Sequence, residues 1–249
     1  IQIVHTYDEM MQANKAGKIY IFKGIEGLAA IGEDLSKIDK YYDFGCRHAM
    51  LTWNEANALG AGALSGQSYG LTAAGKEAAK LIQAKGMLLD VSHLNDAGFW
   101  DIVKLAKKPI VASHSNSRVM CDVPRNLTDD QLRAIRDLDG VVGLNSFNIF
   151  VDHDPAKQTV ENLARHAEHM IDIMGIDHVG CGFDFFEFIE DEETMGSMAA
   201  SSTPAVTGMD DASQIPNLFK VFEKMGLSQE ERDKIARLNF QAVVKKTIG

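Results

Sequence analysis

Short apolar runs alternate along this chain with amphipathic stretches. Six runs are apolar, are often rich in β-branched residues and end in polar or glycine residues; they cover residues 19–27, 47–53, 87–93, 109–115, 140–147 and 178–185. Continuous apolar runs of this length are typical of strands that are buried on both faces, as in a parallel sheet. The pattern therefore predicts six buried strands.

Helical periodicity occupies the stretches between these runs. Residues 159–174 carry apolar side chains three and four positions apart, which predicts one amphipathic helix. Thr128 followed by Gln131 is a capping-box pattern and predicts the start of a second helix. We expect a third helix to begin at Thr72 and a fourth to cover residues 6–15, before the first run.

The alternation of strands and helices predicts an α/β fold with a parallel sheet. Six such strands suit an open doubly wound sheet, and they equally suit six of the eight strands of a barrel. Periodicity does not choose between the two. We find no internal repeat and no linker, so the 249 residues are interpreted as one domain covering 1–249.

Composition narrows the function classes. The chain is 45% hydrophobic, as ordinary globular domains are, and its formal net charge is −10. An acidic chain is a poor partner for nucleic acid or for an anionic membrane surface, since both need clustered Lys and Arg. No apolar run approaches the roughly 20 residues that span a bilayer.

Three features bear on cellular location. The three cysteines are far apart and none lies in a CxxC motif, which fits reduced thiols in the cytosol. The chain has no charged-then-apolar leader. Because it opens on Ile1 and not on Met, we expect the natural start to lie upstream, and we predict a cytoplasmic location on these grounds alone.

Residues 190–213 depart from the regular pattern, being acidic and then rich in Ser, Thr and Ala, without a clear period. We interpret this segment first as a surface loop. The alternative is a lid over a site at the end of the preceding strand.

Polar residues that could carry chemistry stand at the ends of the predicted strands. Glu26 ends the first run, His93 the third, and His114 lies in the fourth, while Asp184 lies in the last. Parallel strands present their carboxyl ends at one common edge, so these side chains should meet there. A carboxylate and two imidazoles form an ordinary ligand set for zinc or a similar divalent metal, so Glu26, His93 and His114 are predicted metal ligands.

Other candidate chemistries are weaker. A lone histidine at a strand end is more often structural than metal-binding, and only the combination favours a metal. His166 and His169 are three positions apart on a predicted helix, but the acidic helix face around them favours a solvated surface. The sequence contains no GxGxxG or Walker A motif. Metal-assisted hydrolysis is therefore the favoured reaction class.

Several motifs together resemble one family. They are IEG around Glu26, LLDVSHLNDAGFWDI (88–102), PIVASHSNSR (109–118), PRNLTDDQL (124–132), IDHVGCGFDF (176–185) and GMDDASQIPNL (208–218). Over essentially the whole chain they resemble the renal-type, or membrane, dipeptidases, which are peptidase family M19 within the amidohydrolase-like barrels.

This resemblance implies a (β/α)8 TIM-type barrel with two zinc ions at its mouth, and hydrolysis of small dipeptides by a hydroxide that bridges the metals. By resemblance, Glu26 bridges both metals, and His93 and His114 complete the second. Arg125 matches the arginine that binds the substrate carboxylate, and Asp184 the aspartate that shuttles the proton to the leaving amine. Family members are often homodimers, so a homodimer is also expected.

The chain departs from the family pattern at two points. The first metal of the family also takes a His-x-Asp from the opening strand, and no such motif ends an opening strand here. Six strands are visible where a closed barrel has eight, so we expect the N-terminal two to be absent from this chain. Trp53 stands where mammalian members carry a histidine, and we interpret it as a substrate-binding wall residue.

Two alternatives stay open. A related amidohydrolase could act on another amide, a lactone or a phosphoester. A catalytically silent metal-binding barrel is also compatible with the missing His-x-Asp.

Overall fold

One parallel sheet organises the molecule. This computed structural model describes residues 1–185 and 205–249. Within them, six strands pair in parallel, each with the next along the chain. They are β3 (Lys23–Ile25), β4 (Cys46–Met50), β5 (Leu88–Asp90), β6 (Ile110–Ala112), β7 (Val141–Leu144) and β8 (Val179–Cys181). All six predicted strands are confirmed, although each is shorter than its apolar run.

The order of the strands separates the two α/β architectures that periodicity left open. A doubly wound sheet reverses direction part-way, so that strands adjacent in sequence are separated in the sheet. Here the order is strictly consecutive from β3 to β8, which is the order of strands around a barrel wall. The chain is therefore α/β with barrel-type topology. That two further strands precede these six in the natural protein remains a prediction.

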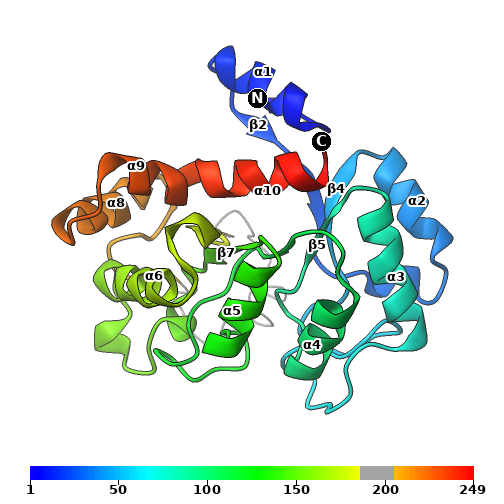
Figure 1. Ribbon diagram of the computed structural model, residues 1–249. Helices are drawn as coiled ribbons and strands as arrows, with labels where there is room; N and C mark the ends of the chain where they lie inside the picture. The colour runs from blue at the N-terminus through cyan, green and yellow to red at the C-terminus, as the bar shows by residue number, and fades with distance from the viewer. Residues whose placement is uncertain (186–204) are drawn as a thin grey trace.

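Helices follow the strands in turn and lie on the outside of the sheet (Figure 1). They are α2 (Ser36–Asp43), α3 (Ala73–Ala84), α4 (Asp96–Leu105), α5 (Asp129–Asp137) and α6 (Val160–Met174). The predicted helices starting at Thr72 and Thr128 and the one over 159–174 are confirmed. In each case a threonine side chain accepts the backbone N–H three residues later, and the capping box of Thr128 and Gln131 is complete.

Helix α10 (Asn239–Thr247) covers the end of the sheet opposite to the strand carboxyl ends. It closes a C-terminal segment that also contains α8 (Ile215–Lys224), α9 (Gln229–Asp233) and a π-helical turn (Lys234–Leu238). Val243 and Val244 of α10 pack against Leu88, Val111 and Val141 near the beginnings of three strands. Because this end is filled by apolar side chains, the opposite end is the one available to polar groups.

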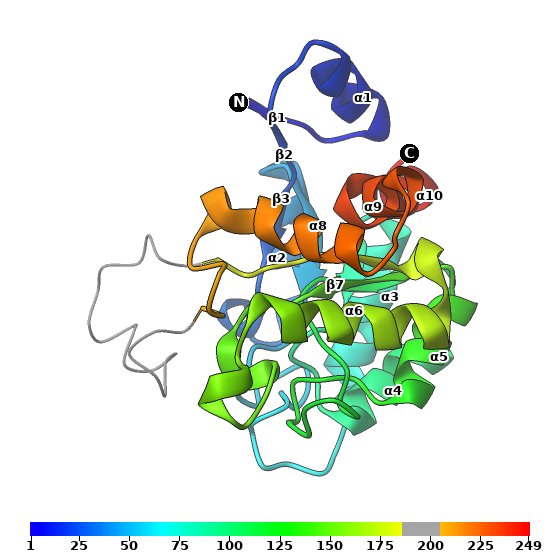
Figure 2. The ribbon, with the colours of Figure 1, turned by 90° about the vertical axis from the view of Figure 1, so that its left-hand side faces the viewer.

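A small N-terminal unit extends beyond this end of the sheet. The strands β1 (Gln2–Ile3) and β2 (Tyr20–Ile21) pair in parallel and enclose α1 (Tyr7–Lys15), which confirms the helix predicted over 6–15. Figures 1 and 2 show the unit standing above α10. The first apolar run is thus divided between β2 and β3, an outcome that the hydrophobic pattern does not predict.

The predicted loop or lid over 190–213 lies partly outside the described residues, which resume at residue 205. The described part of the segment is packed: Val206 and Met209 are fully buried. Thr207 forms a bridge with Thr159, directly before α6. Val206 and Met209 therefore belong to the core around α6.

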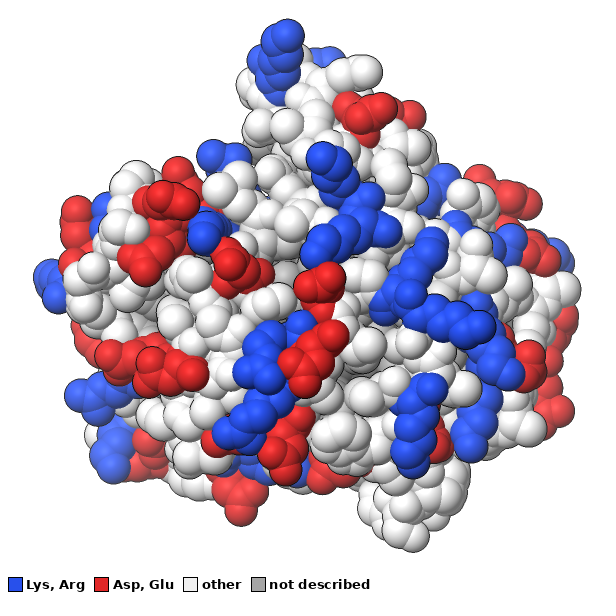
Figure 3. All heavy atoms as spheres, in the orientation of Figure 1, with Lys and Arg blue, Asp and Glu red and all other residues white. Residues whose placement is uncertain are grey.

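The surface carries charges of both signs. On the face seen in Figure 3, Lys and Arg side chains lie among Asp and Glu side chains. Among the described residues, no helix combines the length and the apolar character needed to cross a bilayer.

Candidate metal centre

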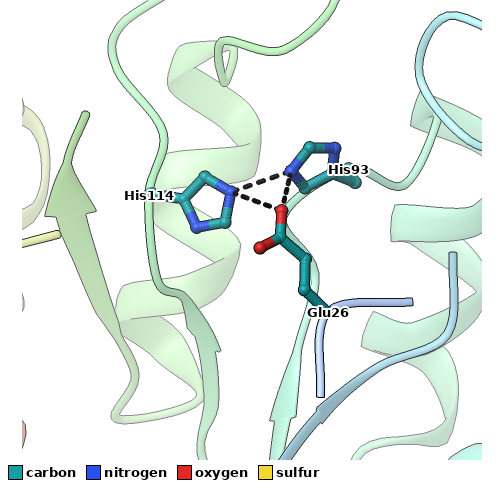
Figure 4. A group of neighbouring side chains, drawn as sticks. All are labelled: Glu26, His93 and His114. Carbon is teal, nitrogen blue, oxygen red and sulfur yellow. Dashed lines mark hydrogen bonds and ion pairs between the residues drawn. The ribbon is translucent and has the colours of Figure 1, made fainter. Parts of the chain in front are cut away.

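Glu26, His93 and His114 come together at the carboxyl ends of three parallel strands, as predicted. Glu26 follows β3, His93 follows β5 and His114 follows β6. Figure 4 shows the three side chains pointing toward one another. Nε2 of His93 lies 2.9 Å from Oε1 of Glu26 and 2.8 Å from Nε2 of His114, which lies 3.6 Å from the same carboxylate oxygen.

Neighbouring side chains fix how the two imidazole rings face. Nδ1 of His93 lies 2.8 Å from Oδ1 of Asn54, and Nδ1 of His114 lies 2.8 Å from Oγ of Ser113. An amide oxygen only accepts, so the His93 proton is assigned to Nδ1 and its Nε2 presents a lone pair to the centre. Such outer hydrogen bonds are the usual means of orienting metal-binding histidines.

Both imidazoles are neutral at physiological pH. Burial, followed by the positive charge of Arg125, lowers the pKa of His93 to about 2 and that of His114 to about 3. Their contacts with Glu26 are therefore not ion pairs, despite the short distances. Neutral imidazole is the form that binds a metal, since the ligand must offer a lone pair.

The donor set fits a divalent cation. Ligand atoms from the three residues all lie within 4.8 Å of one another, and both histidines are buried while Glu26 is exposed. Nε2 of His93, Nε2 of His114 and a carboxylate oxygen of Glu26 converge on one point, an arrangement that a divalent cation would stabilise. Nitrogen and oxygen ligands of this kind suit zinc and related divalent metals.

Two site residues have an unusual backbone conformation. His93 has a φ angle of 68° and Asp184 one of 60°, in the left-handed region that non-glycine residues rarely adopt. Such conformations cost about 1–3 kcal/mol each and persist only where surrounding contacts hold them. Here the carbonyl of His93 accepts a hydrogen bond from the Ala63 N–H at 2.7 Å.

Arg125 is a buried cation next to the three convergent residues. Its side chain is 3% exposed, and Nη2 donates to the carbonyl of His114 at 3.3 Å. Burial lowers its pKa to about 10, against the opposing charges of Asp184, Asp90 and Glu26, so it stays protonated at neutral pH. Its buried Nε has no hydrogen-bond partner among the described residues. A buried, unpaired donor on a cation favours an anionic ligand.

Asp184 lies three residues after the end of β8. Nδ2 of Asn145 donates to its Oδ2 at 3.3 Å. The pKa of Asp184 is raised to about 6, first by desolvation and then by Glu26, while Arg125 and Asn145 act in the opposite direction. Asp184 is exposed to solvent as a residue, although its carboxyl group is partly desolvated. The carboxyl group is therefore accessible to a ligand. A carboxyl group with this pKa can exchange a proton near neutral pH.

Trp53 forms a wall beside the three convergent residues. Its ring stacks on the ring of His93, with centroids 5.8 Å apart and an angle of 29° between the planes. The chain passes close to it at Gly27, whose φ is +83° and where a Cβ would lie 3.2 Å from the Trp53 backbone nitrogen. Glycine at this position lets Glu26 and Trp53 share one side of the centre.

Nearly the whole chain matches one known protein family. The model of the membrane dipeptidase family, peptidase family M19, matches residues 1–248. The chain belongs to the M19 membrane dipeptidase family. The resemblance of its sequence motifs is thereby confirmed.

Relatives of this M19 chain include proteins from several organisms. It is 36% identical over 231 residues to an uncharacterised protein in the pqqA 5′ region of Klebsiella pneumoniae, covering 89% of this chain and 79% of that protein. It is 31% identical to an uncharacterised dipeptidase of Schizosaccharomyces pombe, covering 93% of this chain. The match spans about half (54%) of that yeast protein.

A solved relative supports the fold of the M19 chain. A metallopeptidase from Rhodobacter sphaeroides, in complex with a phosphinate mimic of the dipeptide L-Ala-D-Ala, superposes with a TM-score of 0.87 and 29% identity. The match covers 98% of this chain and 68% of that one.

An asparagine network joins the segments that carry Arg125 and Asp184 in this M19 chain, and the sequence did not reveal it. Asn116 and Asn145 exchange hydrogen bonds between side chain and backbone, at 2.9 and 3.0 Å. The Asn116 N–H donates to Oδ1 of Asn126, which directly follows Arg125. All three asparagines are fully buried. Their partners are distant in sequence, so no local pattern indicates them.

The interpretation of His166 as a solvated residue was wrong. Its ring is fully buried; Nδ1 accepts from the Ser117 N–H at 3.2 Å and Nε2 donates to the carbonyl of Val151 at 2.8 Å. His166 thus joins the loops after β6 and β7. His169 forms a separate pair with Asp129, 2.8 Å away. Neither contributes to the group of Glu26, His93 and His114.

Proposed function

We propose that this chain forms the catalytic barrel of a zinc-dependent dipeptidase, with Glu26, His93 and His114 as metal ligands. The observation that carries the proposal is the convergence of these three donors in an M19 chain, beside buried Arg125 and Asp184, whose pKa is raised to about 6. Zinc would act as a Lewis acid and would lower the pKa of water, so that hydroxide is available at neutral pH.

Two zinc ions are part of the proposal. Glu26 would contact both of them, while His93 and His114 would complete only one. The second pair of family ligands, a His-x-Asp from an opening strand, is not in this sequence. The residues described here would therefore make one of the two proposed zinc positions nearly complete.

Arg125 would hold the carboxylate of the substrate. Its guanidinium is charged, buried and only partly satisfied by the protein, so a carboxylate would supply the missing acceptor. This favours a small substrate with a free C-terminal carboxylate over a lactone or an uncharged amide. The dipeptide mimic bound to the Rhodobacter sphaeroides relative supports the same substrate class.

Asp184 would move the proton. Its carboxylate would accept a proton from the attacking water and deliver it to the amine nitrogen as the peptide bond breaks. A pKa of about 6 suits both steps, because the group is mostly ionised at neutral pH but is readily protonated. Asn145 would hold one carboxylate oxygen, which leaves the other for the transfer. Trp53 would form a wall of the pocket.

Zinc stoichiometry together with dipeptide turnover tests this proposal. The chain should bind at least one zinc ion per molecule by elemental analysis, and a strong chelator should abolish the hydrolysis of small dipeptides. Restored zinc should restore turnover. Full turnover in the metal-free protein would eliminate the proposal, and a metal-free protein without turnover at any zinc concentration would favour the silent barrel. A cytoplasmic location and a homodimer remain predictions.

Substitution of Arg125 distinguishes a dipeptidase from a related amidohydrolase. We expect Arg125→Met to lower kcat/KM for a dipeptide by about 10²-fold, because truncating one partner of a buried charge pair costs about 2–5 kcal/mol. Most of the change should appear in KM. The same dipeptide with an amidated C-terminus provides the matched substrate, and its much slower hydrolysis should change little. Equal effects on both substrates would favour the alternative amidohydrolase.

A further inference from the structure

Asp90 is a fully buried carboxylate at the end of β5, beneath the metal centre. Its Oδ1 accepts two backbone hydrogen bonds, from the Ser92 N–H at 2.8 Å and from the Ser113 N–H at 3.1 Å. These serines directly precede the two histidines of the centre, His93 and His114. One carboxylate oxygen therefore contacts the backbone next to both candidate ligands, on two neighbouring strands.

A second hydrogen bond strengthens this link between the strands. Oγ of Ser92 accepts from the His114 N–H at 3.2 Å. The side chain of Ser92 is thus bonded to the backbone after β6, while the backbone N–H of Ser92 is bonded to Asp90. Two hydrogen bonds to side chains therefore join the ends of β5 and β6, from the Ser113 N–H to Asp90 and from the His114 N–H to Ser92.

The other oxygen of Asp90 is held by a histidine that the proposed chemistry does not use. Oδ2 lies 2.6 Å from Nε2 of His48 on β4. Burial alone would raise the pKa of Asp90, but the hydrogen bond and charge of His48, with contributions from His114 and Ser113, hold that pKa well below its usual range. The carboxylate is therefore ionised, and both of its oxygens accept hydrogen bonds.

The backbone conformation of His93 explains why contacts just before it would matter. It stands in the left-handed region at a φ of 68°, which needs surrounding contacts to persist. Asn54 contacts only the ring of His93. The hydrogen bond from the Ser92 N–H to Asp90 holds the backbone one residue before the strained position.

We propose that Asp90 is a positioning residue for the metal centre, holding the backbones of Ser92 and Ser113 so that His93 and His114 converge toward Glu26. The proposal rests on the metal-dependent function proposed above. Asp90 would not touch metal or substrate, and its effect would act through the two histidines. Outer-shell residues of this kind typically change metal affinity by 10–100-fold.

Zinc affinity, measured by competition with a chromophoric chelator, tests this role. We expect Asp90→Ala to weaken zinc binding by about 10–100-fold, since both serine N–H groups lose their acceptor. Asp90→Asn should bind zinc nearly as tightly as the natural chain, because an amide oxygen can accept the same two hydrogen bonds. A loss in Asp90→Asn as large as that in Asp90→Ala would overturn the proposal, because charge and not backbone positioning would then govern zinc affinity.

Gln83 supplies a matched control for stability. It is also buried, and its side chain accepts from the Lys107 N–H at 3.0 Å and donates to the Lys108 carbonyl at 3.1 Å, before the opposite end of β6. Gln83→Ala should lower the Tm without changing zinc affinity. Wild-type zinc affinity in Asp90→Ala would overturn the positioning role.

Two further outcomes keep the test decisive. If Asp90→Ala does not fold, Asp90→Ser replaces it, because one short hydroxyl cannot serve both backbone donors; unchanged zinc affinity in that variant would equally overturn the proposal. Absence of zinc binding in the natural chain would instead refute the metal-dependent function itself. The two failures are therefore distinguishable.

Discussion

Replacing His93 with alanine should lower kcat/KM for small dipeptides by about 10³-fold or more. The substitution removes one of three convergent donors, and the electrostatic contribution of a catalytic metal is several kcal/mol, of which each 1.36 kcal/mol is a factor of ten. Zinc affinity should fall together with the rate. Turnover by purified protein and zinc content by elemental analysis provide the two measurements.

His153→Ala is the matched histidine control for this experiment. His153 is exposed and lies outside the group of convergent residues, so its removal should leave both rate and zinc content unchanged. Circular dichroism would verify that His93→Ala keeps its fold. Natural turnover in a folded His93→Ala protein would remove this residue from the proposed metal site.

Replacing Asp184 with asparagine should lower kcat by about 10³-fold, within the range that general acid–base groups contribute. Asparagine keeps the shape of the side chain, but it can neither accept nor deliver the proton. Substrate binding through Arg125 should persist, so KM should change far less than kcat. Steady-state kinetics with one dipeptide would separate the two parameters.

The dependence of activity on pH provides a second, independent test of Asp184. The carboxylate must be ionised to accept a proton from water, so activity of the natural chain should fall as the pH drops through about 6, the raised pKa of this group. Asp184→Asn should lose this acidic limb. Asp210→Asn, at an exposed position, should keep it. An unchanged acidic limb in Asp184→Asn would assign the titration to another group.

The strands were predictable because burial on both faces leaves a local mark, a short apolar run. Their order in the sheet was not, because it depends on which strands pair, and pairing is a contact between distant residues. The division of residues 19–27 into β2 and β3 has the same origin: β2 pairs with β1, while β3 pairs with β4.

The candidate site followed a similar rule. Glu26, His93 and His114 were predictable from their positions at strand ends, and they do meet. Asp90 lies inside the third apolar run and ends β5, but its partners are distant in sequence: His48 lies on β4 and Ser113 directly follows β6. His166 appeared solvated from its acidic neighbours, yet it is buried by two loops that are far away in sequence.

The left-handed backbone at His93 limits which metal ligands this position can accept. Histidine, asparagine and aspartate enter that region more readily than other residues with a Cβ, whereas a cysteine or a glutamate would bear the full steric cost. Thiolate ligands bind Cu(I) and iron–sulfur clusters as well as zinc, while imidazole suits zinc and other first-row divalent ions. The main chain at this one residue thus disfavours replacement of the imidazole by a thiolate.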